Sequence, residues 1–381
     1  MMSSHPLKLH LVAFDIPFPP DYGGAIDVFY QIKNLSEAGV AIYLHCPQYG
    51  GRVPAPTLEA LCARVWYYPR KTGLAGISVK YPYMVCSRRH PDMLHNLVQV
   101  EAPILFDGVS TAYYMDHPAL RNRLKIMRNQ NVEQDYYRLL ADREENLLKR
   151  MYYRIESALL RRYENRLQAA DAFFTVALHD HAFFRDKYPA AVHEYIPSFQ
   201  PYQEVRSALG TGSFCLYHGN LGLAENREAA KFLLQEVIPG LDVRFVIAGR
   251  NPDDELKLLA EKAGAELIAN PDMDQMNELI HGAQVHVLPT FQNTGLKLKL
   301  LHALFNGRHV LVNEAMVHGT GLADICEVAA DGTGFRSAIK KLMSEDFGAA
   351  AVKRRSDVLL QHYNNKKNTE RIITFLQQRS R

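Results

Sequence analysis

Two lysines, Lys297 and Lys299, lie where a polar loop gives way to an apolar helix. The loop ends at Thr294 and Gly295, and leucines then recur at helical spacing. The first N–H groups of a helix are unpaired and the helix dipole is positive there, so a helix start attracts anions. Lysines oppose that dipole, so their presence at this helix start needs an explanation. An anionic ligand such as a diphosphate supplies one, and a solvated basic start to an ordinary helix is the alternative.

The segments on either side of this loop predict where it lies in the fold. Residues 285–288 and 310–312 are apolar runs typical of strands, and Gly307 ends the helix where a C′ glycine is expected. Strand, loop, helix and strand in that order put the loop at the carboxyl end of a parallel sheet. With 3.6 residues per turn, Lys299 points about 200° away from Lys297, so we expect Lys297 to meet the ligand.

A second polar cluster follows the predicted strand 124–127. It contains Gln130, Asn131 and Glu133. Polar groups directly after a buried strand lie at the usual ligand-binding edge of an open α/β sheet, which makes these residues candidates for catalysis. The ordinary alternative is a capped helix start, which would also explain Asn131 and Glu133.

A glycine pair, Gly23 and Gly24, stands between a predicted strand at 9–14 and a predicted helix at 25–38. Glycines at such a turn let a ligand or another backbone approach closely, and a tight turn is the simpler explanation. The GxGxxG fingerprint is absent from this turn, so a nicotinamide site is not supported.

The alternation of strands and helices runs through the first half of the chain and restarts after Gly212. A proline-flanked stretch begins at Pro197, so we place a linker at 197–212. Two successive α/β halves joined by one linker predict two Rossmann-like domains facing a central cleft.

The composition excludes several classes of protein. The chain has 381 residues, of which 47% are hydrophobic and 22% charged, and its net charge of +3 argues against a dedicated nucleic-acid binder. Its five cysteines are scattered and form no CxxC pair, which disfavours a zinc site and indicates a reducing compartment. No apolar run approaches the roughly 20 residues of a membrane span, and we see no signal peptide. We therefore expect a soluble, cytoplasmic protein.

One long helix is expected over residues 142–170. It is basic because it carries Arg143, Lys149, Arg150, Arg154, Arg161, Arg162 and Arg166. A solvated helix face is the simpler interpretation. The alternative is peripheral contact with anionic lipid at the inner face of a membrane.

The segment 295–307, GLKLKLLHALFNG, is similar to the G-I-K-x-K-x-L-E-A-M-A-x-G segment of retaining glycosyltransferases of the GT-B fold, in the large family 4 (group 1) class. Other stretches resemble further parts of that family: 214–226 its strand and glycine turn, 246–249 its V-x-G strand end, 19–24 its N-terminal glycine loop, and 129–133 its H-N-x-E segment. The resemblance covers almost the whole chain.

This resemblance implies a domain plan. Residues 1–200 would form the acceptor-side domain and residues 201–360 the nucleotide-sugar donor domain. The C-terminal helix, residues 361–381, would return to the N-terminal domain.

The resemblance also implies a set of site residues. Lys297 would neutralise the leaving nucleoside diphosphate, with Gly219 and Asn220 beside it, and charge stabilisation of that kind is usually a large catalytic term. His302 would face the ribose, while Gly249 and Asn270 would border the base. The full predicted donor set is Gly23, Gly24, Gly219, Asn220, Gly249, Arg250, Asn270, Thr294, Gly295, Lys297 and His302, and the catalytic set is Gln130, Asn131 and Glu133. We predict no metal and no cofactor other than the sugar donor.

Two residues depart from the family pattern. His302 replaces the glutamate that binds the ribose, and a neutral imidazole accepts one hydrogen bond where a carboxylate accepts two. Gln130 replaces the histidine of the H-N-x-E segment, and glutamine cannot carry a proton near pH 7. The phosphate half of the predicted donor site is therefore kept, and its sugar and ribose half is altered.

Three functions compete on this basis. The first is an active transferase that moves a hexose from a nucleoside-diphosphate sugar to a cell-surface glycan or lipid-linked precursor, with retention and without metal. The second, motivated by Gln130 and His302, is a catalytically weak GT-B protein that binds a nucleotide sugar or glycan as a partner subunit. The third is an isomerase of nucleotide sugars.

Overall fold

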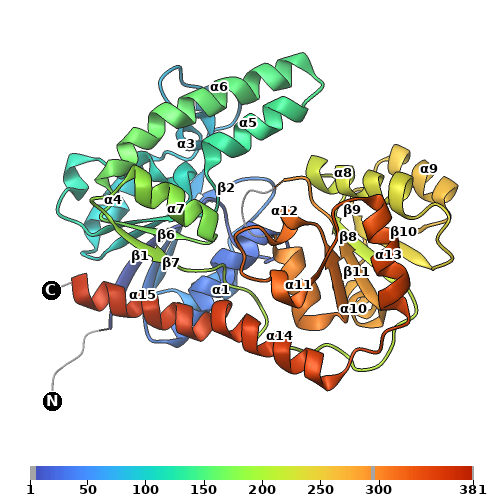
Figure 1. Ribbon diagram of the computed structural model, residues 1–381. Helices are drawn as coiled ribbons and strands as arrows, with labels where there is room; N and C mark the ends of the chain where they lie inside the picture. Colours follow the sequence, from blue (N-terminus) through green and yellow to red (C-terminus); the bar gives the residue numbers. More distant parts are fainter. Residues whose placement is uncertain (1–5, 293–296, 380–381) are drawn as a thin grey trace. The chain divides into compact units, whose positions relative to one another are not determined.

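The computed structural model describes residues 6–292 and 297–379, and each of its two compact units is a parallel β-sheet flanked by helices (Figure 1). Unit 1 comprises residues 6–201 and 363–379, and unit 2 comprises 202–292 and 297–362. Two separate parallel sheets confirm the predicted α/β fold class.

The sheet of unit 1 has seven strands in the order β3-β2-β1-β4-β5-β6-β7. They are β1 (Lys8–Val12), β2 (Ala41–Gln48), β3 (Arg64–Pro69), β4 (Ile104–Asp107), β5 (Lys125–Asn129), β6 (Ala172–Thr175) and β7 (Val192–Tyr195). Alternate residues enter cores on opposite faces: Leu105 packs in one, whereas Ile104 and Phe106 pack in the other. That period of two is expected for strands covered on both sides.

The helices of unit 1 cover both faces of this sheet (Figure 1). They are α1 (Gly23–Glu37), α2 (Pro56–Leu61), α3 (Tyr83–Cys86), α4 (Pro91–Gln99), α5 (Glu133–Arg143), α6 (Leu147–Tyr163), α7 (Leu178–Lys187) and α15 (Asn365–Arg379). From α15, Ile372 and Leu376 enter the same core as Val28 of α1, and the ring of Phe375 meets Phe174 edge-on. The last helix of the chain thus belongs to unit 1, whereas α14 (Ala349–His362) belongs to unit 2.

The single long helix predicted over 142–170 is wrong. The chain ends α5 at Arg143, starts α6 at Leu147, and continues in a 3₁₀ segment, Glu164–Ala169. The side chain of Asn146 accepts hydrogen bonds from the N–H groups of Leu148 and Lys149, so it caps a new helix inside the predicted one. The helices α5 and α6 then lie side by side as a hairpin (Figure 1).

The sheet of unit 2 has six strands in the order β10-β9-β8-β11-β12-β13. They are β8 (Cys215–Asn220), β9 (Phe245–Arg250), β10 (Glu266–Ala269), β11 (Val285–Leu288), β12 (His309–Val312) and β13 (Glu327–Val328). Besides α14, the α-helices of unit 2 are α8 (Ala224–Phe232), α9 (Asp254–Ala263), α10 (Met273–Gly282), α11 (Leu298–Asn306), α12 (Glu314–Val317) and α13 (Gly332–Met343). The predicted order of strand, loop, helix and strand is therefore confirmed for β11, α11 and β12.

Gly307 ends α11 for a different reason from the one predicted. Its φ is −94°, so it is extended and not left-handed. A Cβ at this position would lie 2.0 Å from Nε2 of the buried His286. Glycine is required because the chain passes over an imidazole, not because the helix ends in a left-handed turn.

Candidate functional site

The carboxyl edge of the unit 2 sheet holds the start of α11 next to the end of β8. Lys299, in the first turn of α11, donates from Nζ to Oδ1 of Asn226 at 2.8 Å and to the hydroxyl of Tyr217 at 3.3 Å. Asn226 in turn donates from Nδ2 to the carbonyl of Asn220, the last residue of β8, at 3.0 Å. These bonds place an ammonium where β8 ends and α8 begins.

The electrostatic state of Lys299 is unusual. Burial, and next the charge of Lys297, lower its pKa to about 7, while Glu225 acts in the opposite direction. The two ammonium groups are therefore close enough to repel each other. This crowding of positive charge favours a bound anion, because an anion would relieve the repulsion between the lysines.

Lys297 itself is the N-cap residue of α11 and is extended, with φ −89° and ψ 105°. The expectation that Lys299 points about 200° away from it assumed that both residues are helical, and this assumption is wrong. Thr294 and Gly295, the other predicted site residues of this loop, lie outside the described residues.

Gly219 and Asn220 are the last two residues of β8 and pair with Gly249 and Arg250 of β9, so they continue the strand where a turn was predicted. A Cβ on Gly249 would come within 1.8 Å of the carbonyl oxygen of Gly219. The close approach of the Gly219 backbone therefore explains why residue 249 is a glycine. These residues all lie at the carboxyl edge of the sheet, as does Lys299.

Asn270 follows β10 at the same edge. Its Oδ1 accepts from the N–H of Asn251 at 2.9 Å, and its own N–H donates to the carbonyl of Gly249 at 2.8 Å. Both asparagines have a left-handed backbone, with φ near 54°. Asparagine tolerates this conformation better than most residues, and here the side-chain bond of Asn270 fixes the loop that follows β9.

His302 lies one turn after Lys299 on α11, inside a group of aromatic rings. It stacks on Tyr202 with ring centres 5.3 Å apart and meets His218 edge-on at 5.7 Å. Burial lowers the pKa of His302 to about 4 and also lowers the pKa of His218. Both imidazoles are therefore neutral at pH 7, and His302 is a partly buried neutral ring at the predicted ribose position.

The predicted catalytic residues lie in unit 1, at the carboxyl edge of its sheet. Gln130 follows β5 and donates from Nε2 to Oδ1 of Asp107 at 3.2 Å and to Oδ2 of Asp27 at 3.4 Å. Arg128 donates to both oxygens of Asp27, at 2.5 and 3.0 Å. Two carboxylates thus hold the amide group of Gln130.

This cluster is deeply buried. Asp107 and Arg128 are fully buried and Asp27 almost so. Burial raises the pKa of Asp107 to about 7, against the opposing charge of Arg128. Asp27 also accepts from the N–H of Phe199 at 2.6 Å, so it ties α1 to the segment that follows β7. A buried charge pair held by this many bonds resists rearrangement.

The ordinary explanation of Asn131 and Glu133 as a helix start holds in part, because α5 begins at Glu133, but Asn131 is not its N-cap. Val132 is the N-cap residue of α5 and makes no side-chain capping bond. Burial raises the pKa of Glu133 to about 7, while a hydrogen bond with Asn131 and the charge of Arg88 lower it. Glu133 is thus a carboxyl group that titrates near neutral pH at this edge.

Gly23 and Gly24 are the first two residues of α1, a helix that has no side-chain cap and no acidic residue in its first turn. A Cβ at Gly24 would meet the ring of Phe14 at 2.5 Å. Close packing of that ring accounts for one of the two glycines. The helix start remains open to an anion.

Several residues of these sites are absent from the predicted sets: Asp27, Asp107, Arg128, Tyr217 and Asn226. Lys299 was noted in the sequence but expected to point away from the ligand. Asp107 and Arg128 each stand at or near the end of a predicted strand, which is the signal that could have found them. Asp27 and Asn226 lie on helices and carry no such signal.

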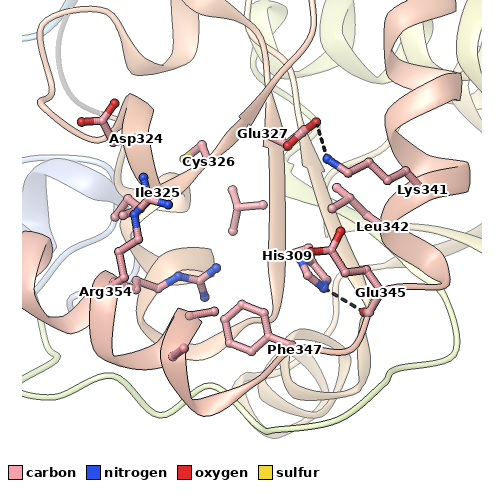
Figure 2. A pocket seen from close by; sticks show the side chains of 14 residues that line it. His309, Asp324, Ile325, Cys326, Glu327, Lys341, Leu342, Glu345, Phe347 and Arg354 are labelled. Atoms are coloured by element: carbon pink, nitrogen blue, oxygen red, sulfur yellow. Dashed lines mark hydrogen bonds and ion pairs between the residues drawn. The ribbon is translucent and has the colours of Figure 1, made fainter.

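A cavity of about 340 Å³ lies elsewhere in unit 2, between β12, β13, α13 and α14 (Figure 2). His309 at the amino end of β12 donates to the carbonyl of Glu345 at 3.0 Å, and Lys341 pairs with Glu327 at 3.3 Å (Figure 2). None of the predicted site residues lines this cavity. It lies at the amino end of the strands, whereas the predicted donor residues of unit 2 follow the carboxyl ends.

Two features are absent from residues 6–292 and 297–379. No group of three or more His, Cys, Asp or Glu side chains there could hold a metal ion. No helix in that part of the chain is long and apolar enough to span a bilayer. Asp272 and Asp274 form an Asp-x-Asp sequence at the start of α10, where Asp272 caps the helix by accepting from the N–H of Gln275 at 2.8 Å.

The chain is similar to known glycosyltransferases. Residues 213–350, most of unit 2, match the family model described as "Glycosyl transferases group 1". A protein of Klebsiella pneumoniae, described as an uncharacterized 44.6 kDa protein in the cps region, is 23% identical over 339 residues, which are 82% of this chain and 84% of that protein. The matched segment carries the lysines of α11, and the match supports a transferase.

Solved structures agree in fold. Sucrose-phosphate synthase from Thermosynechococcus elongatus superimposes with a TM-score of 0.68 at 12% identity, over 98% of each chain. The UDP-forming α,α-trehalose-phosphate synthase from Burkholderia xenovorans gives a TM-score of 0.62 at 10% identity, over 97% of this chain and all of that one. At such identities the likeness concerns the fold, which is GT-B.

Proposed function

We propose that the chain transfers a hexose from a nucleoside-diphosphate sugar to a cell-surface glycan or a lipid-linked precursor, with retention of configuration and without a metal ion. The observation that carries this proposal is the pair of ammonium groups, Lys297 and Lys299, at the start of α11 in the domain that matches group 1 glycosyltransferases. The relative from a cps region supports polysaccharide biosynthesis as the setting.

The donor's diphosphate would bind at the carboxyl edge of the unit 2 sheet. There the two lysines would neutralise the charge that develops on the leaving diphosphate as its bond to the sugar breaks, and fixed charges of this kind need no reorganisation during the reaction. The amide of Asn226 holds the Lys299 ammonium in place. His302, neutral at pH 7, would offer the ribose a single hydrogen-bond acceptor.

The acceptor would bind in unit 1 beside Gln130, Asn131 and Glu133. Gln130 cannot remove a proton, so it would orient the attacking hydroxyl. Glu133, with a pKa of about 7, is the group that could take up a proton at neutral pH. The loop at Gly23 and Gly24, with its open helix start, would stabilise negative charge.

The donor test is a calorimetric titration with UDP, GDP, ADP and dTDP, followed by hydrolysis of the matching nucleotide sugars without acceptor. We expect one nucleotide to bind and its sugar to be hydrolysed slowly. NMR of the first-formed product decides retention, and an excess of EDTA that leaves the rate unchanged supports a metal-independent reaction. Failure to bind every nucleotide refutes the proposal.

A second candidate function is supported by Gln130 and His302, which stand where the family carries a histidine and a glutamate. In that case the chain would bind a nucleotide sugar or glycan for a partner subunit without turning it over. Binding with no hydrolysis and no transfer would favour this function, and an epimerised nucleotide sugar in the same assay would reveal an isomerase.

A further inference from the structure

Two arginines of unit 1 lie next to each other with no carboxylate to pair with. Arg70 follows β3 and donates from Nε to Oγ of Ser87 at 3.0 Å. Arg88 donates from Nε to the carbonyl of Phe14 and from Nη1 to that of Met84, both at 2.7 Å. In the described part of the chain, neither guanidinium has an acidic group within ion-pair distance.

The two guanidinium groups repel each other. Burial, and next the charge of Arg70, lower the pKa of Arg88 to about 10, which leaves it charged at neutral pH. Asp15, whose charge acts on Arg88, already pairs with Arg52 at 3.6 Å and accepts from Tyr22. Asp15 and Glu133 act on Arg88 only from beyond ion-pair distance, so two neighbouring positive charges without a direct ion pair favour a ligand with negative charge, and guanidinium suits phosphate in particular.

These arginines lie beside the predicted acceptor residues. The charge of Arg88 acts directly on Glu133, the first residue of α5. Arg70 lies over the ring of Tyr83, 5.7 Å from its centre, and the N–H of Tyr83 donates to Glu156 of α6 at 2.6 Å. The pair therefore interacts with both helices of the α5–α6 hairpin, through Glu133 and through Tyr83 and Glu156.

An apolar stripe on α6 is left uncovered next to this pair. Leu148, Met151, Tyr152 and Ile155 follow the i, i+3, i+4, i+7 spacing of one helix face, and they are exposed by 74, 56, 40 and 51%. Such spacing normally marks a buried face. Here the stripe runs along the half of α6 nearest the turn with α5, and this turn lies away from the sheet of unit 1 (Figure 1).

Positive side chains lie among the residues of the stripe, while Glu144 and Glu145 stand in the turn before it. Lys149, Arg150 and Arg154 lie on the same half of α6, and no described group pairs with them. At the other end, Glu156, which follows Ile155, accepts from the N–H of Tyr83, whose ring lies below Arg70, so the apolar stripe leads to the arginine pair. An apolar surface that ends at two unpaired guanidiniums matches a molecule with a hydrocarbon chain and a phosphate head.

We propose that the acceptor is a sugar carried on a lipid phosphate or diphosphate: a hydroxyl of that sugar attacks the donor, Arg70 and Arg88 bind the phosphate, and the exposed face of α6 covers the hydrocarbon chain. This inference rests on the proposed glycosyltransferase function and selects the lipid-linked member of its two acceptor classes. It also places the membrane contact on the apolar stripe, whereas the sequence had suggested the row of arginines.

The test uses the full chain and three kinds of vesicle: phosphatidylcholine alone, the same lipid with 10 mol% undecaprenyl phosphate, and the same lipid with phosphatidylglycerol at equal negative charge. We expect at least about tenfold tighter binding to the undecaprenyl phosphate vesicles than to the phosphatidylglycerol ones. Inorganic pyrophosphate, titrated separately, reports the head-group site without the chain.

Variants separate the two parts of the site. Arg70→Gln should weaken binding to undecaprenyl phosphate vesicles and to pyrophosphate by about tenfold or more, with Arg185→Gln on α7 as the control. Met151→Glu should weaken only vesicle binding, with Leu258→Glu, another exposed position, as the control. Arg88 holds two backbone carbonyls, so Arg88→Lys is the milder second variant if Arg70→Gln fails to fold.

The vesicle and nucleotide results distinguish failure of this inference from failure of the proposed function. Equal binding to phosphatidylglycerol and undecaprenyl phosphate means membrane adhesion only and overturns the inference, and so does pyrophosphate binding to which the lipid chain adds nothing. No lipid binding with intact nucleotide binding also overturns the inference while the proposed function stands. If no nucleotide binds and no nucleotide sugar is hydrolysed, the proposed function itself fails.

Discussion

Lys299 donates from Nζ to Oδ1 of Asn226 at 2.8 Å, and this bond joins the start of α11 to the start of α8. The same asparagine donates to the carbonyl of Asn220, so three segments at the carboxyl edge of the unit 2 sheet are held together. The bond fixes one ammonium in position, and the extended Lys297 next to it supplies a second. The predictions for the donor site follow from the different ways in which these two lysines are held.

Lys297→Ala should weaken nucleoside diphosphate binding by roughly one to two decades. A charge-assisted contact to phosphate is typically worth about 1.5–3 kcal/mol, and its removal leaves the backbone contacts of the helix start in place. Calorimetric titration with UDP and GDP measures the change. Lys257→Ala, an exposed lysine on α9, is the matched control. Unchanged affinity of Lys297→Ala for every nucleotide that the wild type binds would place the donor site elsewhere.

Lys299 should make diphosphate binding depend on pH. Its pKa is lowered to about 7, so its ammonium is charged below that pH and loses its charge above it. We expect affinity to fall between pH 7 and pH 9, by up to about tenfold for the loss of one charged contact. Lys299→Met should bind more weakly at pH 7 and show a flatter profile. A wild-type profile as flat as that of the variant would contradict this assignment.

The strands and most helices could be predicted because their apolar residues recur at period two or near 3.6, and such patterns depend on neighbours in the sequence alone. The break between α5 and α6 could not, because residues 144–146 contain no proline or glycine and Asn146 caps only when the chain turns there. The sequence correctly predicted that α11 ends at Gly307, but not why a glycine is needed. The side chain that excludes a Cβ there is His286 of β11.

The candidate site residues likewise divide into those that the sequence indicates and those that it does not. Lys297 and Gln130 could be proposed as site residues from the sequence because each follows a recognisable strand or loop. Gln130 is held by Asp27 of α1 and by Asp107 of β4. These partners lie about 100 and 23 residues away in sequence. Charged residues are usually exposed, so nothing local predicts that Asp107 and Arg128 would be fully buried together.

Asp107 should make stability depend on pH. Burial raises its folded pKa to about 7, above the usual value of 3.8, so the folded chain binds a proton that the unfolded chain has lost between those values. The contribution of this group to the unfolding free energy therefore decreases as pH rises from about 4 to 7 and is constant above. Asp107→Asn should lose less stability between pH 5 and pH 8 than the wild type.

Urea unfolding at pH 5 and at pH 8 measures this difference, with Asp186→Asn as the control for an exposed carboxylate. Glu133 also has a raised pKa, so the variant should keep part of the wild-type slope. If Asp107→Asn and wild type lose equal stability between the two pH values, Asp107 does not titrate in this range.

Gly307→Ala should destabilise unit 2. The new Cβ would lie 2.0 Å from Nε2 of His286, which is itself bonded to the carbonyl of Ile280 at 3.1 Å. Overpacking of this kind typically costs about 1–3 kcal/mol. Combining it with His286→Ala should remove the clash, so the double variant should be more stable than the two single changes predict by addition. Strict additivity in urea unfolding would show that the two positions do not interact.

Gln130→Ala should impair transfer to the acceptor while donor binding stays intact. The two carboxylates on Nε2 leave Oε1 as the free acceptor of the amide, and no described group donates to it. An oxygen held in this way can accept from the attacking hydroxyl and orient it, and loss of such positioning can cost up to about a hundredfold in rate. Gln99→Ala on α4 is the matched control. The decisive comparison is transfer to the acceptor against titration of the nucleotide: a variant that transfers sugar at the wild-type rate would remove Gln130 from the catalytic set.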